Sequence, residues 1–306
     1  MGAIKKFLSN PKVYAVYAMG RLFNGSSKKD EIYLNMLYKL KMGKKIDFKN
    51  PKTFNEKQQW MKAHYYNPLY TQLADKYAVR EYIKEKIGEE YLIPLLGVYD
   101  KFDDIDFDKL PNQFVIKCNH DSGGLVICKD KAKLDKDKAK IRIESCLKRS
   151  YYLNSREWVY RDIKPKIIIE QYMENENKNG LIDYKFFCFD GKPEMLYVSE
   201  GLEDHSTAKI SFLTLDFQLA EFKRKDYRPF SDISQIIKPE HYDEMLKLAG
   251  QLAQGFPFIR VDLYEINDKI YFSEFTFFPC SGMMPFDPEK WDETFGSWYN
   301  LPERNR

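Results

Sequence analysis

The stretch FIRVDLYEINDKIYFSEFTF, residues 258–277, carries the clearest structural signal in the chain. In its first half, Ile259, Val261 and Leu263 alternate with polar or aromatic residues, which is the pattern of a strand with one buried face. The second half is equally rich in β-branched and aromatic residues, and an Asn-Asp pair at 267–268 separates the halves. This arrangement predicts an antiparallel hairpin. The predicted strands are 258–264 and 269–277.

Two acidic residues, Asp262 and Glu274, fall on neighbouring strands of this hairpin, where their carboxylates can face the same side. A hard cation such as Mg²⁺ takes one or two protein carboxylates and completes its octahedron with phosphate oxygens and water. Arg260 shares the face of Asp262 and suits the oxygens of a transferring phosphoryl group or a tetrahedral intermediate. The pattern favours a magnesium site, and an exposed hairpin with a solvated ion pair is the alternative.

Two β-rich runs, 114–117 and 125–128, flank the loop Asn-His-Asp-Ser-Gly-Gly at 119–124. They predict two strands joined by a flexible loop. Lys117 ends the first strand, so its ammonium and the loop amides can converge on phosphate groups. A P-loop is excluded because GxxxxGK[ST] is absent. An ordinary hairpin is the alternative. We expect His120, in the same loop, to face solvent, and a contact with phosphate is its alternative role.

The run KIIIEQY, residues 166–172, indicates a buried strand with Glu170 at its polar end. A strand that leaves the core and turns polar can offer backbone N–H and C=O groups to an adenine edge. Asp183 would then accept hydrogen bonds from ribose hydroxyls. An acidic strand end with a purely structural role is the alternative.

Up to about residue 88 the pattern is helical. Thr53-Phe-Asn-Glu56 is a capping box that opens one helix, and residues 75–86 predict another, with Gly88 as its stop. The remaining predicted elements are a helix at 131–149, a hairpin of strands 184–189 and 194–199, a strand at 209–215 and a helix at 240–253.

The composition indicates a globular protein. The 306 residues are 43% hydrophobic, and no run approaches the roughly 18 apolar residues that span a bilayer. We therefore expect a cytoplasmic location. The five cysteines form no CxxC pair, so we expect buried, reduced thiols and no zinc site.

Positive charge is concentrated at the N-terminus. Residues 1–52 carry twelve lysine and arginine side chains against three acidic ones, an excess of nine positive charges, whereas the whole chain has a net charge of +3. Such a region can lie on the anionic inner face of the cell membrane or on a polyanionic substrate. A solvated helix face is the alternative.

Five stretches, in this order, are typical of one group of proteins. They are NPKTFNEK (50–57), DKYAVREY (75–82), FVIKCNHDSGG (114–124), DYKFFCFDGKP (183–193) and YFSEFTFFPCSGM (271–283). Through them the chain resembles the ATP-grasp superfamily and, more narrowly, the TupA-like ATP-grasp amidoligases encoded with bacterial capsule and cell-wall polysaccharide genes. The resemblance covers about residues 50–285.

The resemblance implies an α+β fold in which two α+β subdomains grip ATP. We expect a helical, basic N-terminal region before the ATP-grasp core. The expected boundaries are 1–90 for the N-terminal region and 91–306 for the core, with a central subdomain at about 91–180 and a C-terminal subdomain at about 181–306.

The resemblance also implies three groups of nucleotide contacts. They are the phosphate-binding residues Lys76, Lys117, Asn119, Ser122, Gly123, Gly124 and Lys185, the adenine-holding residues Gln171, Tyr172 and Met173, and Glu170 and Asp183 for the rest of the adenosine.

Asp262 and Glu274 would hold Mg²⁺, while Arg260 and Lys117 would be catalytic by stabilising transferring phosphoryl and acyl-phosphate oxygens. One departure concerns Thr276, which stands where the superfamily has an asparagine ligand. Because a hydroxyl is a poorer ligand than an amide oxygen, the number of bound metals stays open.

The implied function is an ATP- and Mg-dependent ligase that forms an amide through an acyl phosphate. The implied partners are a uronic acid of a surface polysaccharide or its precursor and a small amine, such as an amino acid or amino alcohol, without nucleic acid. The sequence does not choose between a free sugar, a sugar nucleotide, a lipid-linked glycan and a polymer.

Two other functions are compatible with parts of the sequence. A glycosyltransferase would use Asp106-Phe-Asp108 as a DxD metal motif, although such triplets arise often by chance. A catalytically inactive nucleotide-binding adaptor at the membrane is the second, and the Thr276 departure favours it.

Overall fold

The computed structural model describes residues 11–20, 22–23, 26–121, 123–175, 181–201 and 208–306. Its labelled helices are α2 (Pro11–Met19), α3 (Ser27–Met42), α4 (Phe54–His64), α5 (Pro68–Ala74), α6 (Val79–Lys86), α7 (Lys136–Leu147), α8 (Tyr151–Ser155), α9 (Tyr242–Leu252) and α10 (Lys290–Trp298). Its strands are β1 (Leu95–Tyr99), β2 (Phe114–Cys118), β3 (Leu125–Cys128), β4 (Ile167–Gln171), β5 (Asp183–Phe189), β6 (Lys192–Glu200), β7 (Lys209–Leu213), β8 (Lys223–Arg224), β9 (Phe258–Ile266), β10 (Lys269–Thr276) and β11 (Phe286–Asp287).

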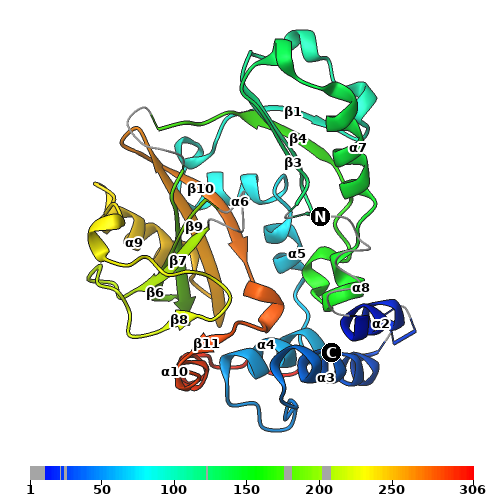
Figure 1. Ribbon diagram of the computed structural model, residues 1–306, viewed down its shortest axis with the longest axis vertical. Helices are drawn as coiled ribbons and strands as arrows, with labels where there is room; N and C mark the ends of the chain where they lie inside the picture. Colours follow the sequence, from blue (N-terminus) through cyan, green and yellow to red (C-terminus); the bar gives the residue numbers. More distant parts are fainter. Residues whose placement is uncertain (1–10, 21, 24–25, 122, 176–180, 202–207) are drawn as a thin grey trace.

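The strands form two antiparallel sheets and a short ribbon. One sheet has the order β10-β9-β5-β6-β7 and the other the order β1-β4-β2-β3, while β8 pairs with β11. Figure 1 shows the four-stranded sheet at the top beside α7 and the five-stranded sheet at the left beside α9, with α5 and α6 between the two sheets. The fold is therefore mixed α+β, as the sequence predicted.

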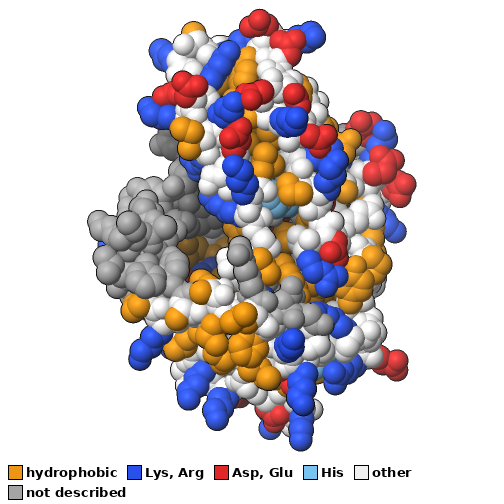
Figure 2. Space-filling view, turned by 90° about the vertical axis from the view of Figure 1, so that its right-hand side faces the viewer, with side chains coloured by type: hydrophobic (Ala, Val, Ile, Leu, Met, Phe, Trp, Pro, Cys, Tyr) orange, Lys and Arg blue, Asp and Glu red, His pale blue; other side chains and the backbone are white. Residues whose placement is uncertain are grey.

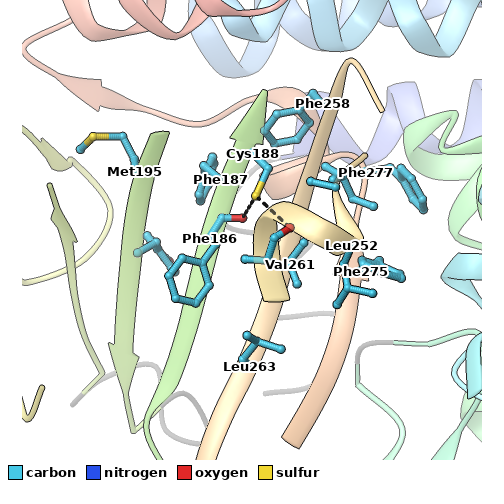
Figure 3. Close-up of a cluster of buried hydrophobic side chains, with 14 of the residues drawn as sticks. Phe186, Phe187, Cys188, Met195, Leu252, Phe258, Val261, Leu263, Phe275 and Phe277 are labelled. Carbon is cyan, nitrogen blue, oxygen red and sulfur yellow. Dashed lines mark hydrogen bonds between the residues drawn. The ribbon is translucent and has the colours of Figure 1, made fainter. Parts of the chain in front are cut away.

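Helix α9 covers one face of the five-stranded sheet. The side chains of Phe186, Cys188 and Val261 are buried on this face (Figure 3). The Cys188 thiol donates weak hydrogen bonds to the carbonyl oxygens of Phe186, at 3.6 Å, and of Ala249 in α9, at 3.9 Å. This face is buried and apolar, so the polar residues of the same strands are directed to the opposite face.

Aromatic side chains cover one end of that opposite face. Phe54 of α4 lies with its ring centroid 4.9 Å from that of Phe258 in β9 and 6.4 Å from that of Phe187 in β5. Phe295 of α10 joins the same cluster, 5.8 Å from Phe54. Because strand residues alternate, Arg260 and Asp262 follow Phe258 on this face, beyond the aromatic cluster.

The four-stranded sheet has its own core. Phe114 and Ile116 of β2 and Ile167 and Ile169 of β4 are buried together with Ile143 of α7. A third buried cluster joins α2 and α3. Among the described residues, no helix combines the length and apolar character that a membrane span requires.

Most predicted elements are confirmed, including the capping box at Thr53 and Glu56. The helix predicted from residue 75 begins at Val79 instead, because Asp75 Oδ1 accepts hydrogen bonds from the backbone N–H groups of Tyr77 and Ala78 and closes a turn there. The helix predicted at 131–149 spans Lys136–Leu147 and follows a short 3-10 turn.

The prediction that all five cysteines are buried is wrong for one of them. Cys118, Cys128, Cys146 and Cys188 are buried free thiols, as predicted, but Cys280 is exposed. Cys280 lies in a turn, Pro279–Gly282, in which Cys280 and Ser281 have positive φ angles, and not in a buried strand like Cys118, Cys128 and Cys188.

Candidate active site

The acidic pair of the last hairpin lies where the sequence predicted it. Glu274 is directly opposite Asp262 in the β9–β10 pairing, and Thr276 is opposite Arg260. The pairing shifts by one residue between Phe272 and Glu274, so Ser273 is an extra residue in β10. A bulge of this kind changes the face to which the following side chains point. Because of it, Glu274 shares the polar face with Asp262.

Two cationic side chains contact Asp262, which is fully buried. Arg260 makes a two-pronged pair with it, Nε to Oδ1 at 2.7 Å and Nη2 to Oδ2 at 2.6 Å. The Lys185 ammonium, from β5, lies 3.0 Å from Asp262 Oδ2 and 3.1 Å from Asp183 Oδ2. Burial disfavours the ammonium, but Asp183 and Asp262 outweigh it and raise the pKa of Lys185.

Glu274 has the most exposed side chain of the acidic residues in this site, with 34% of it accessible to solvent. Its Oε2 lies 3.4 Å from Lys76 Nζ, and its Oε1 lies 3.5 Å from Arg260 Nη2. Burial works against ionisation of Glu274, but Lys76, Arg260 and Lys185 together lower its pKa to about 2. Glu274 is therefore a carboxylate at any physiological pH.

The second sheet contributes another ion cluster. Lys117 of β2 donates to Glu170 Oε2 of β4 at 2.7 Å, and Arg80 of α6 lies 3.4 Å from Glu170 Oε1. Glu170 is only 8% exposed, so most of its contacts with charged groups are with these two cations.

The ion cluster around Glu274 and the one around Glu170 both line one cleft of about 440 Å³. Its lining includes Lys76, Lys117, Glu170, Lys185 and Glu274 from both sheets and from the turn before α6. The cationic lining residues are Lys76, Arg80, Lys117, Lys185, Arg224 and Arg260, and the acidic ones are Asp121, Glu170, Asp183 and Glu274. This excess of cations suits a polyanionic ligand.

Asn119 does not line the cleft but supports the turn that carries Lys76, which does. Its side-chain NH₂ donates to Asp75 Oδ1 at 2.9 Å and to the Lys164 carbonyl at 3.1 Å, while its Oδ1 accepts from the Lys166 N–H at 2.7 Å. Its carbonyl accepts from the backbone N–H of Lys76 at 3.0 Å. Asn119 thus fixes the turn that presents Lys76.

The glycine loop is only partly described. Asp121 and Gly124 line the cleft, whereas Gly123 does not, and Ser122 lies outside the described residues. Asp121 accepts from the Gly123 N–H at 3.0 Å and pairs with Arg149 at 3.2 Å. His120 is 4% exposed, so the expectation that it faces solvent was wrong.

The predicted adenine-holding segment follows β4 past Glu170. Gln171 is exposed, and its backbone N–H donates to the Pro94 carbonyl at 3.0 Å. The Tyr172 ring lies under the Lys129 ammonium, 5.4 Å from its centroid. Neither these residues nor Met173 line the cleft of 440 Å³.

Several cleft residues were missed by sequence reasoning. They are Arg80, Asp121, Tyr197, Arg224, Tyr227, Tyr264 and Ser273. Tyr197 is directly opposite Lys185 in the β5–β6 pairing, and alternation along β6 could have assigned it to the polar face. Arg224 lies in the two-residue strand β8, for which the sequence offers no comparable signal.

The DxD candidate of the glycosyltransferase alternative is not part of the cleft. Asp106 accepts from the backbone N–H of Asp108 at 3.2 Å and pairs with Lys109 at 2.9 Å in an exposed 3-10 turn. Both carboxylates are thus exposed and do not share the cleft with the acidic pair of the hairpin.

The donor set fits Mg²⁺. Within the described ranges no group of three or more His, Cys, Asp or Glu residues is arranged to hold a metal, but Mg²⁺ needs only one or two carboxylates when phosphates supply other ligands. Glu274 lines the cleft, and Asp262 is its direct cross-strand neighbour. Asp262 would share its oxygens between the metal and Arg260 or Lys185.

The sequence matches one protein family, and the structure is similar to several solved structures. The sequence profile of the TupA-like ATPgrasp family matches residues 56–300. No curated protein matches the chain. Among solved structures, the D-alanine–D-alanine ligase from Bacillus anthracis complexed with ATP is 17% identical, with a TM-score of 0.38, over 72% of this chain and 56% of that chain.

Two further solved structures have the same level of similarity. The RimK domain ATP-grasp protein from Sphaerobacter thermophilus is 12% identical, with a TM-score of 0.38, over 75% of this chain and 69% of that chain. The C-terminally truncated Cdc123 from Schizosaccharomyces pombe is 9% identical, with a TM-score of 0.39, over 69% of this chain and 86% of that chain. The chain spans 56% to 61% of the D-alanine–D-alanine ligases that it matches.

The family profile covers 56–300, and the cationic and acidic residues of the cleft fall inside that range. The chain belongs to the TupA-like ATPgrasp family.

Proposed function

We propose that the protein is an ATP- and Mg-dependent ligase that joins a carboxylate to an amine through an acyl phosphate. The observation that carries the proposal is the cleft shared by Lys76, Lys117, Lys185 and Glu274, with Asp262 directly opposite Glu274 on the neighbouring strand. Three ammonium groups and a pair of carboxylates are the charges that a magnesium-bound triphosphate requires.

The reaction has two chemical steps. A carboxylate oxygen attacks the γ-phosphorus of ATP, and the bond from that phosphorus to the β-γ bridging oxygen breaks, which releases ADP. The amine nitrogen then attacks the acyl carbon, and the carbon–oxygen bond to phosphate breaks as the tetrahedral intermediate collapses. The nitrogen loses a proton, and the products are an amide and inorganic phosphate.

The residues of the cleft act by position and charge. Lys76, Lys117 and Lys185 hold the phosphates, and Arg260 stabilises the oxygens of the acyl phosphate and the tetrahedral intermediate. Bound Mg²⁺, held by Glu274 and Asp262, would neutralise phosphate charge.

The carboxylate substrate is proposed to be a uronic acid of a surface polysaccharide or its precursor, and the amine an amino acid or amino alcohol. The family resemblance supports this choice, as does the cationic excess of the cleft. Glycosyltransfer through Asp106 and Asp108 has no such support, because both lie outside the cleft.

The test measures ADP release from ATP with glucuronate and a panel of amino acids and amino alcohols. We expect release only when both carboxylate and amine are present, and loss of at least a hundredfold in Glu274→Gln and Asp262→Asn. Glu303→Gln, at an exposed position, is the matched control and should keep full activity. Full turnover in Glu274→Gln would remove the acidic pair from the mechanism.

We also propose that the N-terminal helices contact anionic lipid. Leu22, Ile32 and Leu40 are exposed apolar side chains on or beside α3, in the region of positive charge excess. Figure 2 shows hydrophobic side chains gathered low on the face that carries α2 and α3, with lysine and arginine side chains along its lower edge. Apolar side chains bordered by cations suit the surface of an anionic bilayer.

A further inference from the structure

A second polar cluster, built around one arginine, lies in the same cleft, and the mechanism above does not use it. Its centre is Arg224, which is 9% exposed. Arg224 is held in place by the ribbon of β8 and β11, in which it is opposite Phe286. Its guanidinium donates to the Tyr197 hydroxyl at 2.8 Å and makes a two-pronged pair with Asp226, at 2.9 and 2.5 Å.

Cross-strand pairing places this cluster relative to the acidic pair. Glu274 is opposite Asp262, Asp262 is opposite Lys185, and Lys185 is opposite Tyr197. The four residues therefore form one row across four strands. With neighbouring strands about 4.8 Å apart, Tyr197 lies roughly 14 Å from Glu274 along the sheet. Arg224 contacts the far end of this row, in a cleft that is continuous with the phosphate-binding lysines.

The partner of Arg224 is easily exchanged. Asp226 is two residues away in the same turn, and 45% of its side chain is exposed, whereas the Arg224 side chain is 10% exposed. A buried guanidinium needs an anionic partner, but a solvated carboxylate can give up that position at little cost. Asp226 thus occupies the place that a carboxylate or phosphate of a ligand would take.

An aromatic side chain completes the cluster. The Tyr227 ring centroid lies 4.8 Å from the guanidinium carbon of Arg224, and Tyr227 lines the cleft with Tyr197 and Ile210. A guanidinium beside flat rings can bind a planar or tetrahedral anion carried on a ring-shaped substrate.

We propose that Arg224 and Tyr197 bind a second anionic group of the carboxylate substrate, with Asp226 as the internal carboxylate that this group displaces. The inference rests on the proposed function, in which the reacting carboxylate lies at Arg260. The substrate is accordingly a uronic acid that carries another negative charge, either a phosphate attached to the sugar or the carboxylate of a neighbouring uronic acid.

The test is calorimetric binding of three ligands to the full chain saturated with ADP and magnesium. The ligands are glucuronate, glucuronate 1-phosphate and a disaccharide of two glucuronates. We expect the wild type to bind at least one of the two doubly charged ligands about tenfold more tightly than glucuronate, since hydrogen bonds to a charged group are worth about one such factor. The 1-phosphate and the disaccharide distinguish a phosphate from a second carboxylate.

Three variants locate the effect. Arg224→Gln should bind the doubly charged ligands and glucuronate with about equal affinity. Arg228→Gln, which changes an exposed arginine nearby, should keep the wild-type preference for the doubly charged ligand. In Asp226→Asn the doubly charged ligand should bind severalfold more tightly, because the competing carboxylate is gone. Equal affinity of the wild type for all three ligands, no binding of any of them, or an unchanged preference in Arg224→Gln would each overturn the proposal.

Separate measurements distinguish a lost binding preference from misfolding of the variant and from a lack of ligase activity. Thermal unfolding shows whether Arg224→Gln is folded, and if it is not, Asp226→Asn decides: unchanged or weaker binding of the doubly charged ligand overturns the proposal. ADP release is measured separately. Failure of every carboxylate and amine to cause it contradicts the proposed ligase, whereas the binding preference reports on Arg224 alone.

Discussion

Glu274 faces Asp262 across the β9–β10 pair because Ser273 is an extra residue in β10. In a regular hairpin built on the Asn267-Asp268 turn, Glu274 would be opposite Val261. It would then share the apolar face that packs against α9. One bulged residue therefore decides whether this carboxylate lies in the cleft or in the core.

Deletion of Ser273 tests this relationship. Without Ser273, Phe272 and Glu274 are consecutive, so a regular strand still places Phe272 opposite Leu263 and Glu274 opposite Asp262. We expect the deletion variant to keep ADP release within about tenfold of the wild type, and Ser273→Ala, which keeps the extra residue, to do the same. Loss of ADP release in the deletion variant but not in Ser273→Ala would contradict the role of Ser273 as an extra residue.

The pH dependence of stability tests the electrostatics of Glu274. Its pKa in the folded protein, about 2, is below the ordinary value of 4.5, so the ionised form is favoured by folding. The resulting stability is present above about pH 4.5 and is lost as the pH falls towards 2. The full shift would be worth about 3 kcal/mol, and partial exposure reduces it to about 1 to 2 kcal/mol.

The measurement compares urea unfolding of the wild type and Glu274→Gln between pH 5 and pH 2. The wild type should lose about 1 to 2 kcal/mol more than the variant over this range, since the variant has no carboxylate to protonate. Identical slopes would mean that Lys76 and Arg260 do not stabilise the Glu274 carboxylate.

The sequence predicted the hairpin and its polar face from local pattern alone. Alternation placed Arg260 and Asp262 together, and the Asn267-Asp268 turn is confirmed, with positive φ at both residues. The position of Glu274 was also predicted correctly, but the bulge that produces it was not. A bulge depends on how two strands pair, and no pattern within one strand records it.

Other residues reach the cleft through contacts between segments that are far apart in the sequence, and no local pattern predicts such contacts. Arg224 reaches the cleft only because β8 pairs with β11, more than sixty residues further along the chain. Asn119 was predicted to touch phosphate, yet its side chain is used to hold Asp75 and two backbone groups. An asparagine in a glycine loop can either bind phosphate or hold neighbouring backbone. Only the packing of the turn that carries Lys76 shows which of these Asn119 does.

A glycine in the turn after β10 tests how tightly this turn packs against α4. Gly282 has φ +62°, and a Cβ added there would lie 2.6 Å from Gln58 Cβ in α4. Gly255 has φ +84° and no atom within 4 Å of such a Cβ. Both glycines are in a conformation that disfavours L-residues, so they form a matched pair.

We expect Gly255→Ala to lower the free energy of unfolding by about 1 kcal/mol through backbone conformation alone. Gly282→Ala should lower it by about 3 kcal/mol, because α4 must also shift. Urea unfolding of both variants gives the difference. Equal losses would show that α4 does not pack tightly against the Pro279–Gly282 turn.

Vesicle sedimentation tests the proposed lipid contact. The wild type should bind vesicles of phosphatidylcholine mixed with phosphatidylglycerol, and salt should weaken the binding because it screens the lysines. Ile32→Ser combined with Leu40→Ser should reduce it severalfold, since both side chains are exposed and apolar. Pure phosphatidylcholine vesicles are the control, and equal binding to both kinds of vesicle would contradict a role for charge.

The central claim is that ammonium groups from both sheets and the acidic pair of the hairpin surround one triphosphate. A crystal structure with a non-hydrolysable ATP analogue and magnesium tests it most directly. We predict phosphate oxygens within hydrogen-bonding distance of Lys117 and Lys185, and a metal about 2.1 Å from a Glu274 oxygen. A nucleotide bound outside the cleft, or a metal without Glu274 among its ligands, would contradict the claim.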